Sequence, residues 1–246
     1  MARYLCLLVC VTSIAQAQIE IPSGPEGQIV SYVGYTLSYN EEHEQANWVA
    51  YELTAQEVQG IVSRSDDFRA DPEIRTGSAT LVDYRGSGYD RGHLAPAADM
   101  KWSEEAMSES FYMSNMSPQV SGFNRGIWKS LENRVRSWAV ENTAVYVVTG
   151  GILSSGLPTI GPDSVSVPEY FYKVILDYQE PELKGIGFIL SNQGSKSSLK
   201  TYAVSIDSVE QRTGIDFFPS LPDDMEERLE SSIDLTLWGF PTGEGN

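Results

Sequence analysis

Four apolar stretches rich in β-branched and aromatic residues constrain the fold of this chain more than any other feature. Each is bounded by glycine, proline, asparagine or charged residues, which is typical of a β-strand, and several are apolar on both faces. These predicted strands are residues 48–54, 145–153, 170–178 and 186–192. They do not alternate regularly with helical segments. The sequence therefore predicts an α+β fold with a mainly antiparallel sheet rather than a doubly wound fold.

Helical periodicity is clearest over residues 124–140. Ile127, Leu131, Val135 and Trp138 recur on one stripe of this segment, whereas charged residues occupy its other positions. Shorter helices are predicted over residues 103–112, 205–212 and 223–231, the second of them ended by Gly214. We expect these helices to flank the sheet.

The stretch LVDYRGSGYDRGHL, residues 81–94, fits a β-hairpin. Residues 81–85 would form one arm, the Gly-Ser-Gly run 86–88 the turn, and residues 89–94 the returning arm. His93 then lies near the end of a short strand. With the long helix that comes later, the predicted order is two short strands followed by a helix.

Residues 1–17 have the features of a secretory signal peptide: one early cation, an apolar run and a small-x-small pattern that ends at Ala17. The apolar run is shorter than the ~20 residues that a membrane-spanning helix needs, and no later segment approaches that length. We therefore predict a secreted or periplasmic protein in which residues 18–246 form a single domain. Both cysteines, Cys6 and Cys10, lie in the predicted signal, so this domain depends on its core rather than on disulfides.

The chain is strongly acidic, with a formal net charge of −17. Such a charge argues against unaided binding of nucleic acid, because affinity for a phosphate backbone comes largely from lysine and arginine. The acid is unevenly spread: cations and carboxylates nearly balance between Arg64 and Arg136, and acid dominates the flanks. A groove for nucleic acid is therefore expected only locally, in this central segment.

The chemistry open to this chain is restricted by its few cysteines and histidines. Loss of both cysteines with the signal removes thiol catalysis, and two histidines make a multi-histidine zinc site unfavourable. Neutral imidazole is a ready general base near neutral pH, and Arg91 projects to the same side of an extended arm as His93. A base beside a fixed cation suits attack on a phosphodiester. His43, in the run EEHEQ, is expected to be a solvated loop residue.

Asn124 and Glu132 lie eight residues apart in the long predicted helix, roughly 12 Å along its axis and about 80° around it. Both cannot contact one small cation directly. Glu132 leans back toward the N-terminus and can reach a metal-bound water, and Mg²⁺ keeps several waters and accepts few protein ligands. The pair is compatible with a Mg²⁺ site. A structural reading, with Asn124 as a helix cap and Glu132 as a surface charge, stays open.

The motifs around these residues resemble those of the DNA/RNA non-specific endonucleases, the ββα-metal or His-Me finger nucleases, and look closer to the endonuclease G branch. The resemblance covers residues 48–222 and includes DRGH at 90–93, SNMSPQ at 114–119, FNRGIWKSLE at 123–132 and TGIDFFP at 213–219. DRGH followed by N-x-x-x-W-x-x-x-E is a specific signature, whereas either half alone is less so. The resemblance implies a ββα-metal catalytic motif within the α+β fold.

The resemblance also implies roles for individual residues. His93 matches the general base that activates the attacking water. Asn124 matches the direct protein ligand of a catalytic Mg²⁺, for which Mn²⁺ can substitute, and Glu132 matches the catalytic carboxylate that holds the ion through water. Arg91 matches the arginine that stabilises charge on the phosphate. The candidate substrate-binding residues are Arg64, Arg91 and Asn115.

The predicted function is that of a Mg²⁺-dependent, sugar-non-specific endonuclease that cleaves DNA and RNA to 5′-phosphate and 3′-hydroxyl ends. Two alternatives remain open. One is a phosphodiesterase acting on small nucleotides, for which an acidic exterior is less of an obstacle. The other is a surface protein that binds nucleic acid without cleaving it. DNA and RNA are the expected partners, and the sequence does not decide whether the protein forms a homodimer.

Overall fold

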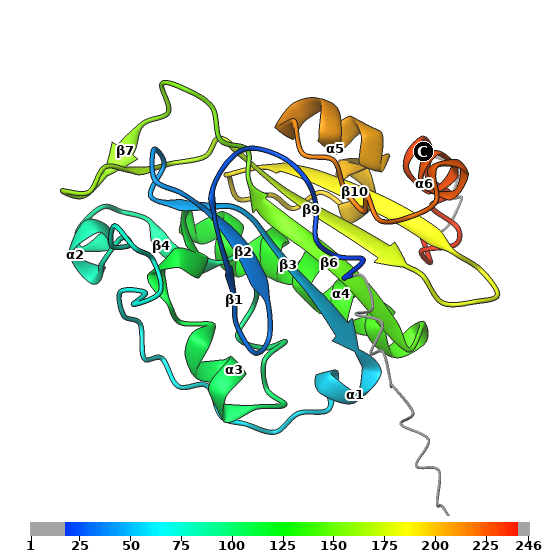
Figure 1. Cartoon of the computed structure of the whole chain (residues 1–246), viewed down its shortest axis with the longest axis horizontal. Coiled ribbons are helices and arrows are strands. Elements are labelled where there is room, and N and C mark those ends of the chain that lie inside the picture. The colour runs from blue at the N-terminus through cyan, green and yellow to red at the C-terminus, as the bar shows by residue number, and fades with distance from the viewer. Residues whose placement is uncertain (1–17, 241–246) are drawn as a thin grey trace, which may run out of the picture.

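A seven-stranded antiparallel sheet organises the protein in the computed structural model, which describes residues 18–240 (Figure 1). The strand order is β1-β2-β3-β6-β9-β10-β11. The strands are β1 (Gln28–Ser31), β2 (Thr36–Asn40), β3 (Gln45–Thr54), β6 (Ala144–Gly151), β9 (Tyr170–Asp177), β10 (Lys184–Ser191) and β11 (Ala203–Val204). The predicted α+β class with a mainly antiparallel sheet is confirmed. The predicted signal peptide, residues 1–17, lies outside the described residues.

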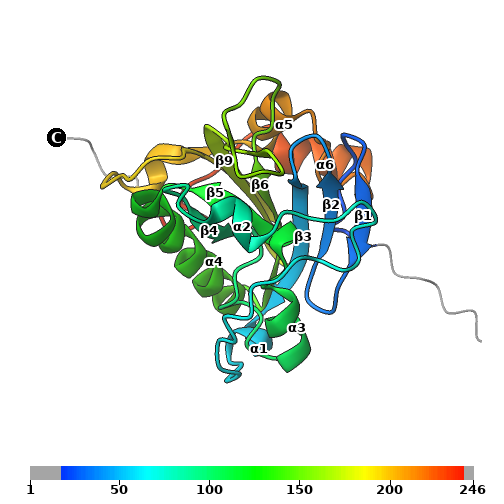
Figure 2. The same ribbon diagram turned by 90° about the vertical axis from the view of Figure 1, so that its left-hand side faces the viewer.

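Helices cover both faces of the sheet, as Figure 2 shows: α4 (Lys129–Glu141) lies on one face, and α5 (Ile206–Thr213) and α6 (Asp223–Glu230) lie on the other. The central strands therefore bury side chains on both sides. In β9, Phe171 packs in the core beneath α4, whereas Tyr172 packs in the core beneath α5 and α6. Successive residues of a strand point to opposite faces, so a strand covered on both sides is apolar throughout.

The shorter elements surround this sheet. The helices predicted over residues 103–112, 205–212 and 223–231 are present as α3 (Glu104–Glu109), α5 and α6, and Gly214 ends α5 with a φ of 69°. The remaining elements are α1 (Ala55–Val58), α2 (Leu81–Tyr84), β4 (Asp90–His93), η1 (Met113–Asn115), β5 (Met116–Gln119), η2 (Phe123–Trp128), β7 (Thr159–Ile160), β8 (Val165–Ser166) and η3 (Leu199–Tyr202). Within residues 18–240 no helix has the length and apolar character needed to cross a membrane.

The predicted hairpin over residues 81–94 is wrong. Its first arm is the helical turn α2, because Thr80 caps that turn and Asp83 accepts a hydrogen bond from the Thr80 backbone N–H at 2.7 Å. Its second arm is β4, which pairs instead with β5, so that His93 lies opposite Met116. The order of two short strands followed by a helix is retained, but the second strand comes from a segment with no clear strand pattern.

The predicted helix over residues 124–140 is not continuous. Its beginning is a π-helical segment, η2, and regular α-helix begins only at Lys129. Gly126 has φ −105° and ψ −109°, which is not a helical conformation. The helical spacing calculated for Asn124 and Glu132 therefore does not apply.

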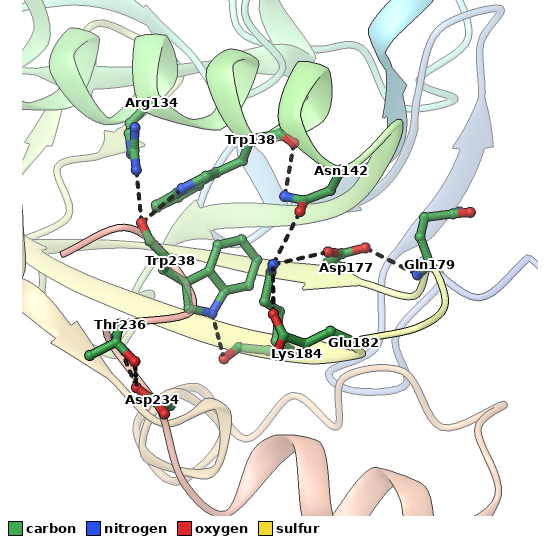
Figure 3. A network of polar contacts seen from close by, with 11 residues as sticks. Arg134, Trp138, Asn142, Asp177, Gln179, Glu182, Lys184, Asp234, Thr236 and Trp238 are labelled. Carbon is green, nitrogen blue, oxygen red and sulfur yellow. Dashed lines mark hydrogen bonds and ion pairs between the residues drawn. The ribbon is translucent and has the colours of Figure 1, made fainter.

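The segment after α6 returns to the α4 face of the sheet and closes the core there (Figure 3). Trp238 is 1% exposed, and its ring meets that of Trp138 edge-on at 4.7 Å between centroids. The Trp238 carbonyl accepts hydrogen bonds from Arg134 Nη2 at 2.8 Å and Trp138 Nε1 at 3.1 Å, and its indole N–H donates to the Gly185 carbonyl at 3.3 Å. This segment thereby fixes α4 to β10.

Trp238→Ala is expected to lower the free energy of unfolding by about 3–5 kcal/mol, because it leaves a cavity between α4 and β10. Leu237→Ala is the matched control, since its side chain is 37% exposed, and it should cost much less. Urea unfolding followed by far-ultraviolet circular dichroism measures both. Equal losses in the two variants would show that Trp238 does not fix α4 in this way.

Candidate active site

His93 stands at the end of β4, held there by the pairing with β5. Its imidazole ring lies between two aromatic rings, with centroids 5.6 Å from Phe68 and 4.9 Å from Phe111. Arginines stack on the same two rings: Arg91 lies 4.1 Å from the Phe68 centroid, and Arg64 lies 4.6 Å from the Phe111 centroid. The histidine and both arginines are thus fixed by one pair of aromatic side chains.

The surroundings of His93 keep it neutral. Burial, followed by the positive charges of Arg64 and Arg91, lowers the pKa of His93 to about 3. Its Nε2 atom is buried and has no hydrogen-bond partner among the described residues. A neutral imidazole can accept a proton through whichever ring nitrogen a reacting group can reach.

Asn124, in η2, is tied to β4 through Asp90. Its amide Nδ2 donates to Asp90 Oδ2 at 3.0 Å, and Arg125 donates to both oxygens of the same carboxylate at 2.8 Å. Burial alone would raise the pKa of Asp90, but these hydrogen bonds outweigh it and hold the pKa below its ordinary value. With Nδ2 engaged, Oδ1 is the atom that Asn124 can offer to a cation.

Glu132 is half-buried in the first turn of α4. Burial raises its pKa to about 7, which the positive charge of Lys173 opposes and the negative charge of Asp99 favours. Lys173 lies in β9 with none of its side chain exposed, and its ammonium group is 4.8 Å from the centre of the Trp128 ring. Burial lowers the pKa of this lysine to about 8, although Glu132 and Asp99 act in the opposite direction. A buried cation therefore lies beneath the carboxylate.

One cavity of about 380 Å³ brings five of the six predicted site residues together. These residues are Arg64, Arg91, His93, Asn124 and Glu132. A second cavity of about 550 Å³ shares four lining residues with the first, so the two adjoin. Together they are lined by six cations, namely Arg64, Arg85, Arg91, Arg125, Lys129 and Arg136, against three carboxylates. The acidic protein therefore has a locally basic cleft, as the even charge balance of the central segment indicated.

Asn115, predicted to bind substrate, is in a different position. It is completely buried, and its Oδ1 accepts from the backbone N–H of Ala95 at 2.9 Å. Its Nδ2 donates to the carbonyls of Ala95 at 3.0 Å and Ser110 at 2.8 Å. All its side-chain polar atoms are used in holding the segment that follows His93. These hydrogen bonds are those of a residue that supports the backbone beside His93.

His43 is not the solvated residue that its acidic neighbours suggested. It is 8% exposed, and its Nδ1 lies 2.8 Å from Ser166 Oγ. It lines neither of the two adjoining cavities. Its burial arises because the turn after β2 packs against β8, a contact that local sequence does not reveal.

Several residues of the site were not predicted from the sequence. Arg125 and Arg85 line the cleft, Phe68 and Phe111 enclose His93, and Lys173 lies beneath Glu132. Only Lys173 left a clear signal, as a lone cation within the apolar strand YFYKVILDY. The aromatic pair could not be found from sequence, because it is assembled from two loops distant from β4.

Comparison with known proteins agrees with this geometry. Residues 15–224 match the family model of the DNA/RNA non-specific endonucleases. Nuclease C1 of Cunninghamella echinulata var. echinulata is 40% identical over 207 residues, which cover 76% of this chain and 81% of that relative. Mitochondrial endonuclease G of Homo sapiens is 35% identical over 212 residues, 79% of this chain and 70% of that protein. A crystal structure of an EndoG/EndoGI complex superposes with a TM-score of 0.77 at 34% identity, covering 81% of this chain and 89% of that one.

The expected secreted or periplasmic location is wrong by the same comparison. A relative that matches most of the chain is named as a mitochondrial protein, not an exported one. The expectation rested on residues 1–17 alone, and the family match already begins at residue 15.

The family model spans most of the sequence, and the fold matches that of a solved EndoG at more than 30% identity. The cleft brings together a histidine, an asparagine, a glutamate and arginines. The chain therefore belongs to the DNA/RNA non-specific endonuclease family and is a nucleic-acid-hydrolysing endonuclease with a ββα-metal fold.

Proposed function

We propose that the protein is a Mg²⁺-dependent endonuclease that cleaves DNA and RNA to products with 5′-phosphate and 3′-hydroxyl ends. The observation that carries the proposal is the cavity of about 380 Å³, which is lined by His93, Asn124, Glu132 and four arginines. A base, oxygen ligands for a cation and fixed positive charge are the groups that phosphodiester hydrolysis requires.

His93 acts as the general base. Its accessible ring nitrogen accepts a proton from the water that attacks phosphorus, the bond from phosphorus to the 3′ oxygen breaks, and that oxygen takes a proton from solvent to become the 3′-hydroxyl. Arg91 and Arg64 stabilise the negative charge that builds on the phosphate oxygens. Because both guanidinium groups are stacked on aromatic rings, they need little rearrangement during the reaction.

Asn124 and Glu132 would hold the metal ion, Asn124 through Oδ1 and Glu132 through a bound water. An amide oxygen and a carboxylate suit a hard cation such as Mg²⁺, and Mn²⁺ can take its place. The bound ion would supply charge neutralisation at the phosphate and the leaving oxygen. Asp90 acts through Asn124: by accepting from Nδ2, it keeps Oδ1 turned away from the carboxylate.

The cleft favours a polymer over a small nucleotide. Two adjoining cavities extend past the reacting groups: Arg85 lines only the one without His93, and Arg125 lines both. Arginines at such positions contact backbone phosphates, which carry no base information, so cleavage is expected to be largely independent of sequence and sugar.

The proposal is tested by incubating plasmid DNA and RNA with the protein in Mg²⁺ and then in excess chelator. Both substrates should be degraded in Mg²⁺ only, and His93→Ala should lower kcat by about 10²- to 10⁴-fold, the contribution of a general base. His43→Ala is the control, because it removes the second histidine of the chain, which does not line the cleft. Intact substrates in Mg²⁺, or a His93→Ala variant as active as the control, would refute the proposal.

The ionisation of His93 gives a second prediction. Its folded-state pKa of about 3 means that the neutral, base-competent form persists as pH falls below the ordinary value of about 6.5. Nuclear magnetic resonance of the metal-free protein, with ring signals assigned by means of His43→Ala, should show no titration of His93 between pH 5.5 and 8. A midpoint at or above 6.5 would mean that burial and the two arginines do not control this ring.

The cleft arginines give a third prediction. Arg85 is exposed at the wall of the cleft away from His93, so Arg85→Ala should weaken polymer binding without changing kcat. Loss of one phosphate contact should reduce the slope of log KM against log salt by about 1. Arg75→Ala, which removes an exposed arginine outside the cleft, should leave the slope unchanged. Identical slopes in both variants would place the substrate elsewhere.

A further inference from the structure

Three carboxylates gather on the face of the sheet opposite α4 and the cleft. Asp207 and Glu210 come from α5 and Glu230 from the end of α6, and each offers an oxygen that lies within 4.8 Å of the other two. Figure 2 shows both helices on this face. The site is therefore separate from the one proposed for catalysis.

The state of Glu230 is a second observation, independent of this proximity. Its side chain is only 4% exposed, and Oε1 is inaccessible and has no hydrogen-bond partner among the described residues. No lysine or arginine within residues 18–240 forms an ion pair with any of the three carboxylates. A buried carboxylate with neither a hydrogen bond nor a countercharge is strongly unfavourable.

Further negative charge surrounds Glu230, from Glu210, Glu226 and Asp207. Some positive species, a proton or a cation, must therefore neutralise this cluster near neutral pH.

We propose that Asp207, Glu210 and Glu230 bind a Ca²⁺ ion that joins α5 to α6. Mg²⁺ keeps several waters and is usually bound through one or two carboxylates, whereas Ca²⁺ takes more oxygen ligands in a flexible geometry. A set of three carboxylates therefore suits Ca²⁺. Glu210 Oε1 accepts from the Phe217 backbone N–H at 2.7 Å, which holds this side chain in place and leaves its other oxygen for the ion.

The ion would act on stability rather than on the reaction. α5 and α6 both pack on β10, but they make few direct contacts with each other. A cation between them neutralises the buried charge and fixes the end of α6, from which the chain leaves toward Trp238.

Thermal unfolding of calcium-free protein, with and without Ca²⁺ at about 100 times its dissociation constant, tests the proposal. The melting temperature should rise by about 5 °C or more. The experiment is done in the Asn124→Ala background, which removes the proposed catalytic ion. Glu230→Gln should abolish the rise, whereas Glu226→Gln, the loss of a neighbouring carboxylate on the same helix, should preserve it. Asp207→Asn, at an exposed position, serves if Glu230→Gln does not fold.

Two results would overturn the proposal: no rise with Ca²⁺, or an equal rise in the Glu230→Gln and Glu226→Gln variants. The first would mean that a proton neutralises Glu230. Neither result bears on nuclease activity, because the assay contains no nucleic acid, and Glu230→Gln in the native background should cleave plasmid in Mg²⁺ as the unaltered protein does.

Discussion

The hydrogen bonds to Asp90 determine how the two halves of the site meet. Asp90 and His93 are the first and last residues of the same strand, and the Asp90 carboxylate accepts from Asn124 and Arg125 in η2. The strand that carries the proposed base is therefore tied directly to the segment that carries the proposed metal ligand. The β4–β5 ladder adds rigidity, and Asn115 fixes the backbone just beyond His93. The distance between His93 and Asn124 thus depends on a short strand and on the Asp90 carboxylate, rather than on a long loop.

Pairing with carboxylates also explains how an acidic protein keeps a basic cleft. Several cleft cations are paired with acids that orient them: Arg64 with Asp66, Arg125 with Asp90, and Arg136 with Asp99. Two of the arginines also lie on aromatic rings beside His93. The exposed Arg64–Asp66 pair contributes little to stability, so its importance lies in the position that it gives Arg64. Carboxylates remote from the cleft take no part in these pairs. They give the rest of the surface its negative charge, which favours solubility.

The sequence predicted those parts of the fold that depend on local pattern. The central strands are apolar on both faces, and α5 ends at a glycine, so each could be found from composition and spacing. The predicted hairpin is wrong because the capping box formed by Thr80 and Asp83 makes a helical turn of the first arm, despite the turn signal at residues 86–88. The continuous helix failed because a single Gly126 conformation interrupts an otherwise regular pattern. The motif predicts His93, Asn124 and Glu132 as site residues. Phe68 and Phe111 reach the site only through tertiary packing, which leaves no local pattern in the sequence.

The two faces of the sheet use buried charge differently. On the α4 face, Lys173 supplies a countercharge from β9 beneath Glu132, and the carboxylate stays open to the cleft above. On the α5–α6 face, Glu230 has no such partner within the described residues. A strand that is buried on both sides can present a lysine to only one face, since neighbouring residues alternate. Tyr172 and Val174, which flank Lys173, are apolar and pack toward α5 and α6, so the sheet itself cannot neutralise acid on that side. Compensation there must come from the helices or from solution.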